Sequence, residues 1–152
     1  MNEQLIEAHE ELKRADHLIY VSLKYTRTAD VIKNIIERFI SFYDRLILAL
    51  LTKLKDEGKI EEIPDSPIEK ALLAKEKFPE DIVKENIELY LLYRKITKAK
   101  YTSTQEFRRH VTMTATLNDG TVIDVDINKI YDYYKKAKEF FEYIKKLGGN
   151  ND

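Results

Sequence analysis

The hydrophobic pattern of this chain changes period once, between residues 106 and 126. Elsewhere, apolar side chains recur every three or four positions, which is typical of amphipathic helices. Inside this stretch they alternate on both sides of an Asn-Asp-Gly sequence, which is typical of two strands joined by a tight turn. The sequence therefore predicts an all-α fold: a helical bundle of about five helices with a small β-hairpin inserted before the last helix.

The register of the hairpin depends on the length of its loop. A three-residue loop, Asn118 to Gly120, places Gly120 at the left-handed position and pairs Ala115 with Ile123 and Met113 with Val125. This register gathers the apolar side chains on one face, whereas a two-residue Asp-Gly loop mixes the faces. Since one buried face fixes register, we expect the three-residue loop.

Periodicity and capping residues set the expected helices. Ser66 precedes Pro67 and Glu69, which is a helix-start pattern, and Asp126 is placed to cap the last helix. Ser103 to Glu106 has the same Ser-x-x-Glu pattern and predicts a short turn of helix at most. The expected helices span about 3–24, 29–57, 66–77, 79–100 and 126–147. The second carries so wide an apolar surface that it should lie at the centre of the bundle.

Length and charge limit the organisation and the partners. At 152 residues with 43% apolar content, we expect one domain spanning 1–152. Its 26 basic and 27 acidic residues nearly cancel, so the molecule has no overall field to attract nucleic acid. Binding of that kind would need a local patch. Abundant Lys and Glu with scarce Gln resemble the composition of hyperthermophile proteins.

Several chemistries are excluded or disfavoured. The chain has no cysteine, which excludes disulfides and thiol catalysis. Its histidines are not paired for metal binding, because His9 and His17 lie about 12 Å apart along a helix. No glycine-rich phosphate loop is present. We expect no metal and no cofactor.

The sequence also resembles neither the pattern of a signal peptide nor that of a membrane span. The N-terminal segment is charged and amphipathic, unlike a signal peptide. The longest apolar run, residues 46–51, is too short to span a bilayer. We expect a cytoplasmic protein with no membrane partner.

The first candidate site is the basic cluster Arg108-Arg109-His110, together with Arg94 on the preceding helix. Such a cluster can bind a phosphate group or an RNA backbone, with Tyr93, Tyr101 or Phe107 available for base stacking. The alternative is structural, because cations near a helix end stabilise its dipole and pair with surface acids.

A secondary polar cluster consists of Asp16, His17 and Tyr20, followed by Lys24 and Arg27. Asp16, Tyr20 and Lys24 are spaced by four positions and share a helix face. This group could transfer protons if it lines a cleft, or it could form a polar seam between helices.

Ten tyrosines are a high count for this length. Tyr133, Phe140 and Tyr143 form a second aromatic line beside the core stripe of the last helix. Exposed aromatic side chains favour a subunit interface, and a two-fold dimer is the commonest oligomer. The alternative is that they fill a wide core.

The order of long helices and a short third helix, with LYLLYRK at 89–95 and IYDYYKKAKEFF at 130–141, resembles the HEPN-like helical domains. The resemblance covers most of the chain and implies a dimeric helical bundle. Many such domains are ribonucleases or nucleotide-binding partners in defence and toxin systems. The ribonuclease members carry an Arg-x(4–6)-His motif, but positions 103–105 before His110 hold Ser, Thr and Gln. The resemblance therefore implies the fold and the dimer, and not catalysis.

We expect a non-catalytic homodimeric interaction module whose surface for RNA, a nucleotide or a protein partner is Arg94, Arg108, Arg109 and His110. One alternative is a ribonuclease with a rearranged active site that uses His110 or His17 as acid or base. Another is a purely structural subunit. The sequence leaves open whether the protein is an enzyme.

Overall fold

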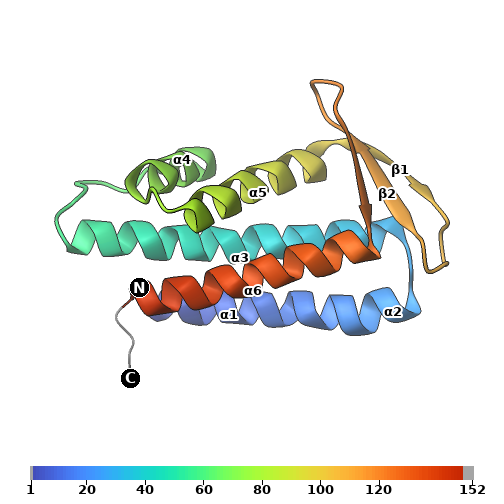
Figure 1. Ribbon diagram of the computed structural model, residues 1–152, viewed down its shortest axis with the longest axis horizontal. Coiled ribbons are helices and arrows are strands. Elements are labelled where there is room, and N and C mark those ends of the chain that lie inside the picture. Colours follow the sequence, from blue (N-terminus) through green and yellow to red (C-terminus); the bar gives the residue numbers. More distant parts are fainter. Residues whose placement is uncertain (1, 149–152) are drawn as a thin grey trace.

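Three helices, Asn2–His17, Ala29–Asp56 and Ile127–Leu147, run along a common axis, and a small sheet stands at one end of them (Figure 1). The computed structural model describes residues 2–148. Its elements are α1 (Asn2–His17), the π-helix η1 (Leu18–Ser22), α2 (Leu23–Tyr25), α3 (Ala29–Asp56), α4 (Pro67–Lys77), α5 (Asp81–Lys98), β1 (Lys100–Thr104), β2 (Thr112–Thr116), β3 (Val122–Asp126) and α6 (Ile127–Leu147). The mainly helical architecture predicted from periodicity is confirmed.

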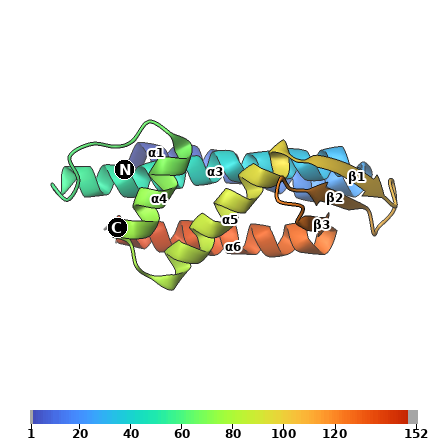
Figure 2. The same ribbon diagram turned by 90° about the horizontal axis from the view of Figure 1, so that it is seen from above.

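Helix α3 lies at the centre of the bundle. It packs against α1, α4, α5 and α6, and its apolar side chains are buried on more than one side. Viewed from above, α5 runs obliquely across α3 and α6 (Figure 2). The wide apolar surface of this helix correctly predicted its central position, because each apolar side of it must be covered by a neighbour.

Capping side chains set the helix ends as expected. Ser66 Oγ accepts from the Glu69 N–H at 3.4 Å, with Pro67 at the first helical position. Asp126 Oδ1 accepts from the Lys129 N–H at 2.8 Å and starts α6 directly after β3. The last strand therefore leads into the last helix without a linker.

The sheet has three antiparallel strands in the order β1-β2-β3. Ala115 pairs with Ile123 and Met113 with Val125, and Gly120 has φ +88°, as the three-residue loop requires. The expected helical turn at Ser103–Glu106 is wrong, because Lys100–Thr104 forms β1 and pairs with β2. Thr, Tyr and Ser side chains suit a strand, and pairing with an available edge outweighs a local capping pattern.

The first helix is interrupted, although the sequence predicted an unbroken helix to about Lys24. At η1 the Leu23 N–H donates to the Leu18 carbonyl, five residues back instead of four. Such a turn holds one extra residue and rotates the side chains that follow it. Ile19 and Leu23 stay buried while Tyr20 reaches the surface.

The aromatic line that favoured a subunit interface is not exposed. Tyr133 and Phe140 are buried, and Tyr143 is partly buried against the same core. Tyr133 meets Tyr93 edge to face, with the ring centroids 4.8 Å apart. This part of the expectation is corrected: these rings belong to the core among α3, α5 and α6.

Candidate functional site

A pocket of about 770 Å³ opens at the end of the bundle that carries the sheet. We call it the sheet-end pocket. The π-helix, α2, the β1–β2 loop and the start of α6 supply its walls. Its lining residues are Ile19, Tyr20, Leu23, Lys24, Arg27, Arg109, His110, Asp126, Ile127, Asn128 and Tyr131.

The pocket joins two clusters that are far apart in the sequence. Lys24 and Arg27 come from the first helical segment and the turn after it, whereas Arg109 and His110 come from the β1–β2 loop. Two contacts hold the loop on that turn. The Phe107 N–H donates to the Arg27 carbonyl at 2.6 Å, and the Glu106 carboxylate accepts from the Ala29 N–H.

The charged lining is mostly cationic. Lys24, Arg27 and Arg109 face a single acid, Asp126, whose carboxylate already caps α6. Within residues 2–148, none of the ion pairs includes Lys24, Arg27 or Arg109, so none of these three cations has an acidic partner there. The Nε of Arg27 is buried and has no hydrogen-bond partner in the same range. These donors are available to an anion.

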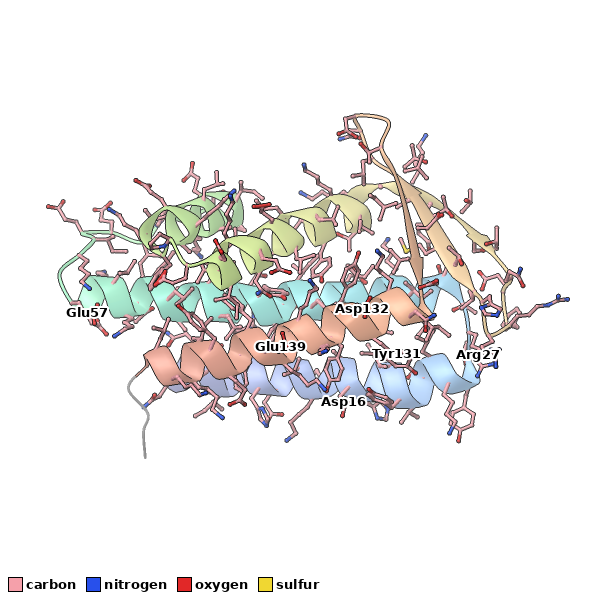
Figure 3. All side chains as sticks on the ribbon, in the orientation of Figure 1. Asp16, Arg27, Glu57, Tyr131, Asp132 and Glu139 are labelled. Carbon is pink, nitrogen blue, oxygen red and sulfur yellow. The ribbon has the colours of Figure 1, made fainter. Side chains whose placement is uncertain are left out.

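Two tyrosines form one wall of the pocket. Tyr20 stacks on Tyr131 with centroids 5.9 Å apart and the planes inclined by 25°. Figure 3 shows Tyr131 and Arg27 in the sheet half of the molecule, with Glu57 at the opposite end. Burial, then Tyr131 and Asp16, raise the pKa of Tyr20. Its hydroxyl therefore stays protonated at neutral pH and is available as a hydrogen-bond donor.

The predicted basic cluster is only partly assembled. Arg109 and His110 line the pocket, while Arg108 is exposed beside it and outside the lining. Arg94 lies elsewhere, on α5, where its guanidinium sits 5.8 Å from the centre of the Tyr90 ring. Its Nη1 donates to the Tyr90 hydroxyl at 3.4 Å. Arg94 thus belongs to the contacts between α3 and α5 and is not brought to the pocket.

The secondary polar cluster also separates. Tyr20 lines the pocket, but Asp16 and His17 do not. Asp16 instead acts on Tyr134 of α6, because burial together with the negative charge of Asp16 raises the pKa of Tyr134 to about 12. His17 is exposed on the last turn of α1. This is the polar seam between helices that was the alternative to proton transfer.

The sequence did not point to the start of α6 as part of the site. Ile127, Asn128 and Tyr131 line the pocket because β3 delivers this helix terminus to the sheet end. The one available signal was position, since Asp126 both ends the hairpin and caps the helix. A helix N-terminus also adds partial positive charge to the pocket wall.

Residues 2–148 contain no group of three His, Cys, Asp or Glu side chains placed to hold a metal ion. None of the helices in that range has both the length and the apolar character needed to cross a bilayer.

Comparison of the chain with protein-family models, curated proteins and solved structures finds no match. Four features of the site bear on its function: its volume, three cations without ion pairs among residues 2–148, a tyrosine wall and a histidine in the lining.

Proposed function

We propose that this protein is a non-catalytic interaction module, HEPN-like in fold and homodimeric, that binds RNA or a nucleotide in the sheet-end pocket. The observation that supports this most is the trio of cations without acidic partners, Lys24, Arg27 and Arg109, beside the Tyr20–Tyr131 wall. Cations attract phosphate, and tyrosine faces accept bases, so the two together suit a nucleotide better than either alone.

The net charge of the chain makes the location of these cations important. Because the whole molecule carries a charge of only −1, attraction of a polyanion must come from a local field. Elsewhere in the bundle, acids such as Glu11 and Glu57 are paired with cations. At the sheet end, Glu106 and Asp126 are engaged by backbone N–H groups, which leaves the pocket cations uncompensated by ion pairs.

The experiment measures RNA affinity as a function of salt concentration. Arg109→Ala should lower the affinity and reduce the salt dependence by about 0.7 in the log-log slope, the value for one single-strand phosphate contact. Lys146→Ala is the matched control, because Lys146 is an exposed cation in the last turn of α6. The proposal fails if Arg109→Ala and Lys24→Ala both leave the affinity and its slope unchanged.

One observation favours a second candidate, a ribonuclease with a rearranged active site. His110 and Arg109 line the same pocket, which brings an acid-base group beside a cation that could stabilise a phosphate. His17, the other histidine considered, lies outside this lining. Incubation of mixed RNA with the wild type and with His110→Ala separates the candidates: cleavage that disappears in the variant supports the enzyme.

The homodimer rests on the family resemblance and on one apolar area between α1 and α6. Ile6 is 66% exposed there, beside a hollow of about 440 Å³ lined in part by His9 and Phe141. An apolar area of this kind is typical of a protein contact. Sedimentation velocity should give a dimer for the wild type and a monomer for Ile6→Glu. A monomeric wild type removes this part of the proposal.

A further inference from the structure

Phe107 combines three properties that folding alone does not explain. Its φ is +65°, a left-handed conformation that is costly for a bulky residue. Its side chain is 74% exposed, so the conformation does not bury the ring. Its N–H is nevertheless held by the Arg27 carbonyl at 2.6 Å, and Gln105 before it also has a positive φ of 59°. Strained residues of this kind gather at functional sites.

Tyr25 is a second exposed ring in the same region. It is 78% exposed at the end of α2, two positions before Arg27, and the Lys24 ammonium lies 5.9 Å from its ring centre. Both rings therefore adjoin residues of the sheet-end pocket without lining it. Each presents an aromatic face to solvent beside a cation.

We infer that the ligand of the sheet-end pocket is a single-stranded nucleic acid several nucleotides long, and that Phe107 and Tyr25 stack on its bases outside the pocket. This inference rests on the proposed function and deepens it by naming the ligand class. A mononucleotide would be satisfied by the pocket and would leave both rings unused.

The chemistry of the surface favours this ligand. Exposed aromatic rings beside a cationic groove are the arrangement with which proteins hold single strands, because every base has a face that can stack. A duplex keeps its bases stacked on one another and offers only its backbone. Arg108, exposed next to Phe107 and without an ion pair among residues 2–148, can neutralise a further phosphate.

The test compares probes of increasing length by fluorescence anisotropy and competition. The probes are uridine monophosphate, a uridine oligomer of about eight nucleotides, the matching thymidine oligomer and an RNA duplex of equal length. The oligomers should bind at least about tenfold more tightly than the mononucleotide and the duplex. If the two oligomers bind equally well, the protein recognises the phosphates and bases that RNA and DNA have in common. If the uridine oligomer binds more tightly, the ligand is RNA.

The variants isolate the two rings. Phe107→Gly and Tyr25→Ala should each lower the affinity for the oligomer at least about fivefold. Neither variant should change the affinity for uridine monophosphate. Phe107→Trp should retain tight binding, because it keeps an aromatic face. Leu72→Ala is the control, since Leu72 is an exposed apolar side chain on α4, away from the sheet. Unchanged melting temperatures show that the variants fold.

Three results would overturn the inference: equal affinity for monomer and oligomer, an oligomer affinity that the ring variants do not change, or equally effective competition by an acidic peptide. Failure of the proposed function would give different results: either no phosphate-bearing probe would bind, or Arg109→Ala would not change the affinity for any of the probes. Loss of length dependence with retained binding of the monophosphate contradicts the inference alone.

Discussion

The backbone N–H of Ala29 lies 3.3 Å from a carboxylate oxygen of Glu106, a residue 77 positions later in the chain. Ala29 is the first residue of α3, where unpaired N–H groups and the helix dipole favour a negative charge. Thr28 caps the same terminus through the Val31 N–H. The long central helix therefore begins on two caps, one local and one supplied by the loop that carries Arg109 and His110.

Glu106→Ala should destabilise the protein by about 1 kcal/mol, because it leaves a helix N-terminal N–H without its charged acceptor. Chemical denaturation measures this loss. Glu76→Ala, an exposed acid on α4, should change stability by less than about 0.5 kcal/mol. Hydrogen exchange at the Phe107 amide should also accelerate in Glu106→Ala, and an unchanged rate would show that Glu106 does not anchor the loop.

Phe107→Gly should leave stability within about 1 kcal/mol of the wild type. Relief of the left-handed strain at φ +65° offsets the entropy that glycine adds to the unfolded chain, and the ring is largely exposed. Phe140→Ala provides the contrast, because Phe140 is fully buried and its truncation should cost about 3–5 kcal/mol. Equal losses in the two variants would mean that Phe107 packs in the core.

Tyr43→Phe and Tyr93→Phe remove the same atom from two fully buried rings. The Tyr43 hydroxyl donates to Asn86 Oδ1 at 2.8 Å. Its loss leaves a buried acceptor without a donor and should lower the free energy of unfolding by about 1–2 kcal/mol. The Tyr93 hydroxyl is buried with no hydrogen-bond partner in the described residues, so its removal should be neutral or stabilising. Denaturation curves of the pair decide this, and a larger loss in Tyr93→Phe would contradict it.

Asp44→Asn should raise stability at neutral pH. Burial raises the pKa of Asp44 above its ordinary value of 3.8, against the lowering effect of the hydrogen bond from Tyr90. A raised pKa means that the folded state binds the proton more tightly than the unfolded state does. Stability therefore falls as pH rises from 3.8 through the folded pKa, and the uncharged asparagine avoids this loss.

The stability difference between Asp44→Asn and the wild type should accordingly grow through that pH interval and then level off. Asp119→Asn is a control of opposite sign. Hydrogen bonds from Thr121 lower the pKa of Asp119, so its carboxylate stabilises the fold above 3.8, and this contribution is lost as pH falls through the folded pKa. If the stability difference between Asp44→Asn and the wild type does not change with pH, folding does not shift the pKa of the Asp44 carboxyl.

The parts of the fold that the sequence predicted depend on neighbours in the chain. The Ser66 cap, the Asp126 cap and the left-handed Gly120 each act within a few residues. The register of β2 and β3 could also be predicted locally, because only one length of the loop between them places the apolar side chains on the same face. Strand β1 was missed because its pairing partners lie across the β1–β2 loop, from Thr104 with Thr112 to Lys100 with Thr116, and because its own pattern fits a helix start.

The sequence predicted residues of the candidate site but not how they are grouped in space. The sequence marked Arg109, His110, Tyr20, Lys24 and Arg27 as chemistry-bearing residues because cations, histidine and tyrosine cluster in those two stretches. It gave no means to place the stretches together, and it grouped Arg94 with the basic cluster, whereas Arg94 does not line the pocket. Spacing along α5 predicts that Arg94 can contact Tyr90, four residues before it, but it does not record where that helix face lies relative to the β1–β2 loop.

Sequence alone thus determined the hairpin and the helices with their caps, apart from the π-helix that interrupts the first one, because hydrophobic period and side-chain capping are short-range effects. Tertiary structure alone decided that the β1–β2 loop lies on the turn between α2 and α3, through Glu106 with Ala29 and Phe107 with Arg27. Contacts between residues so distant depend on how the central helix and the sheet are packed, and no local pattern encodes that packing.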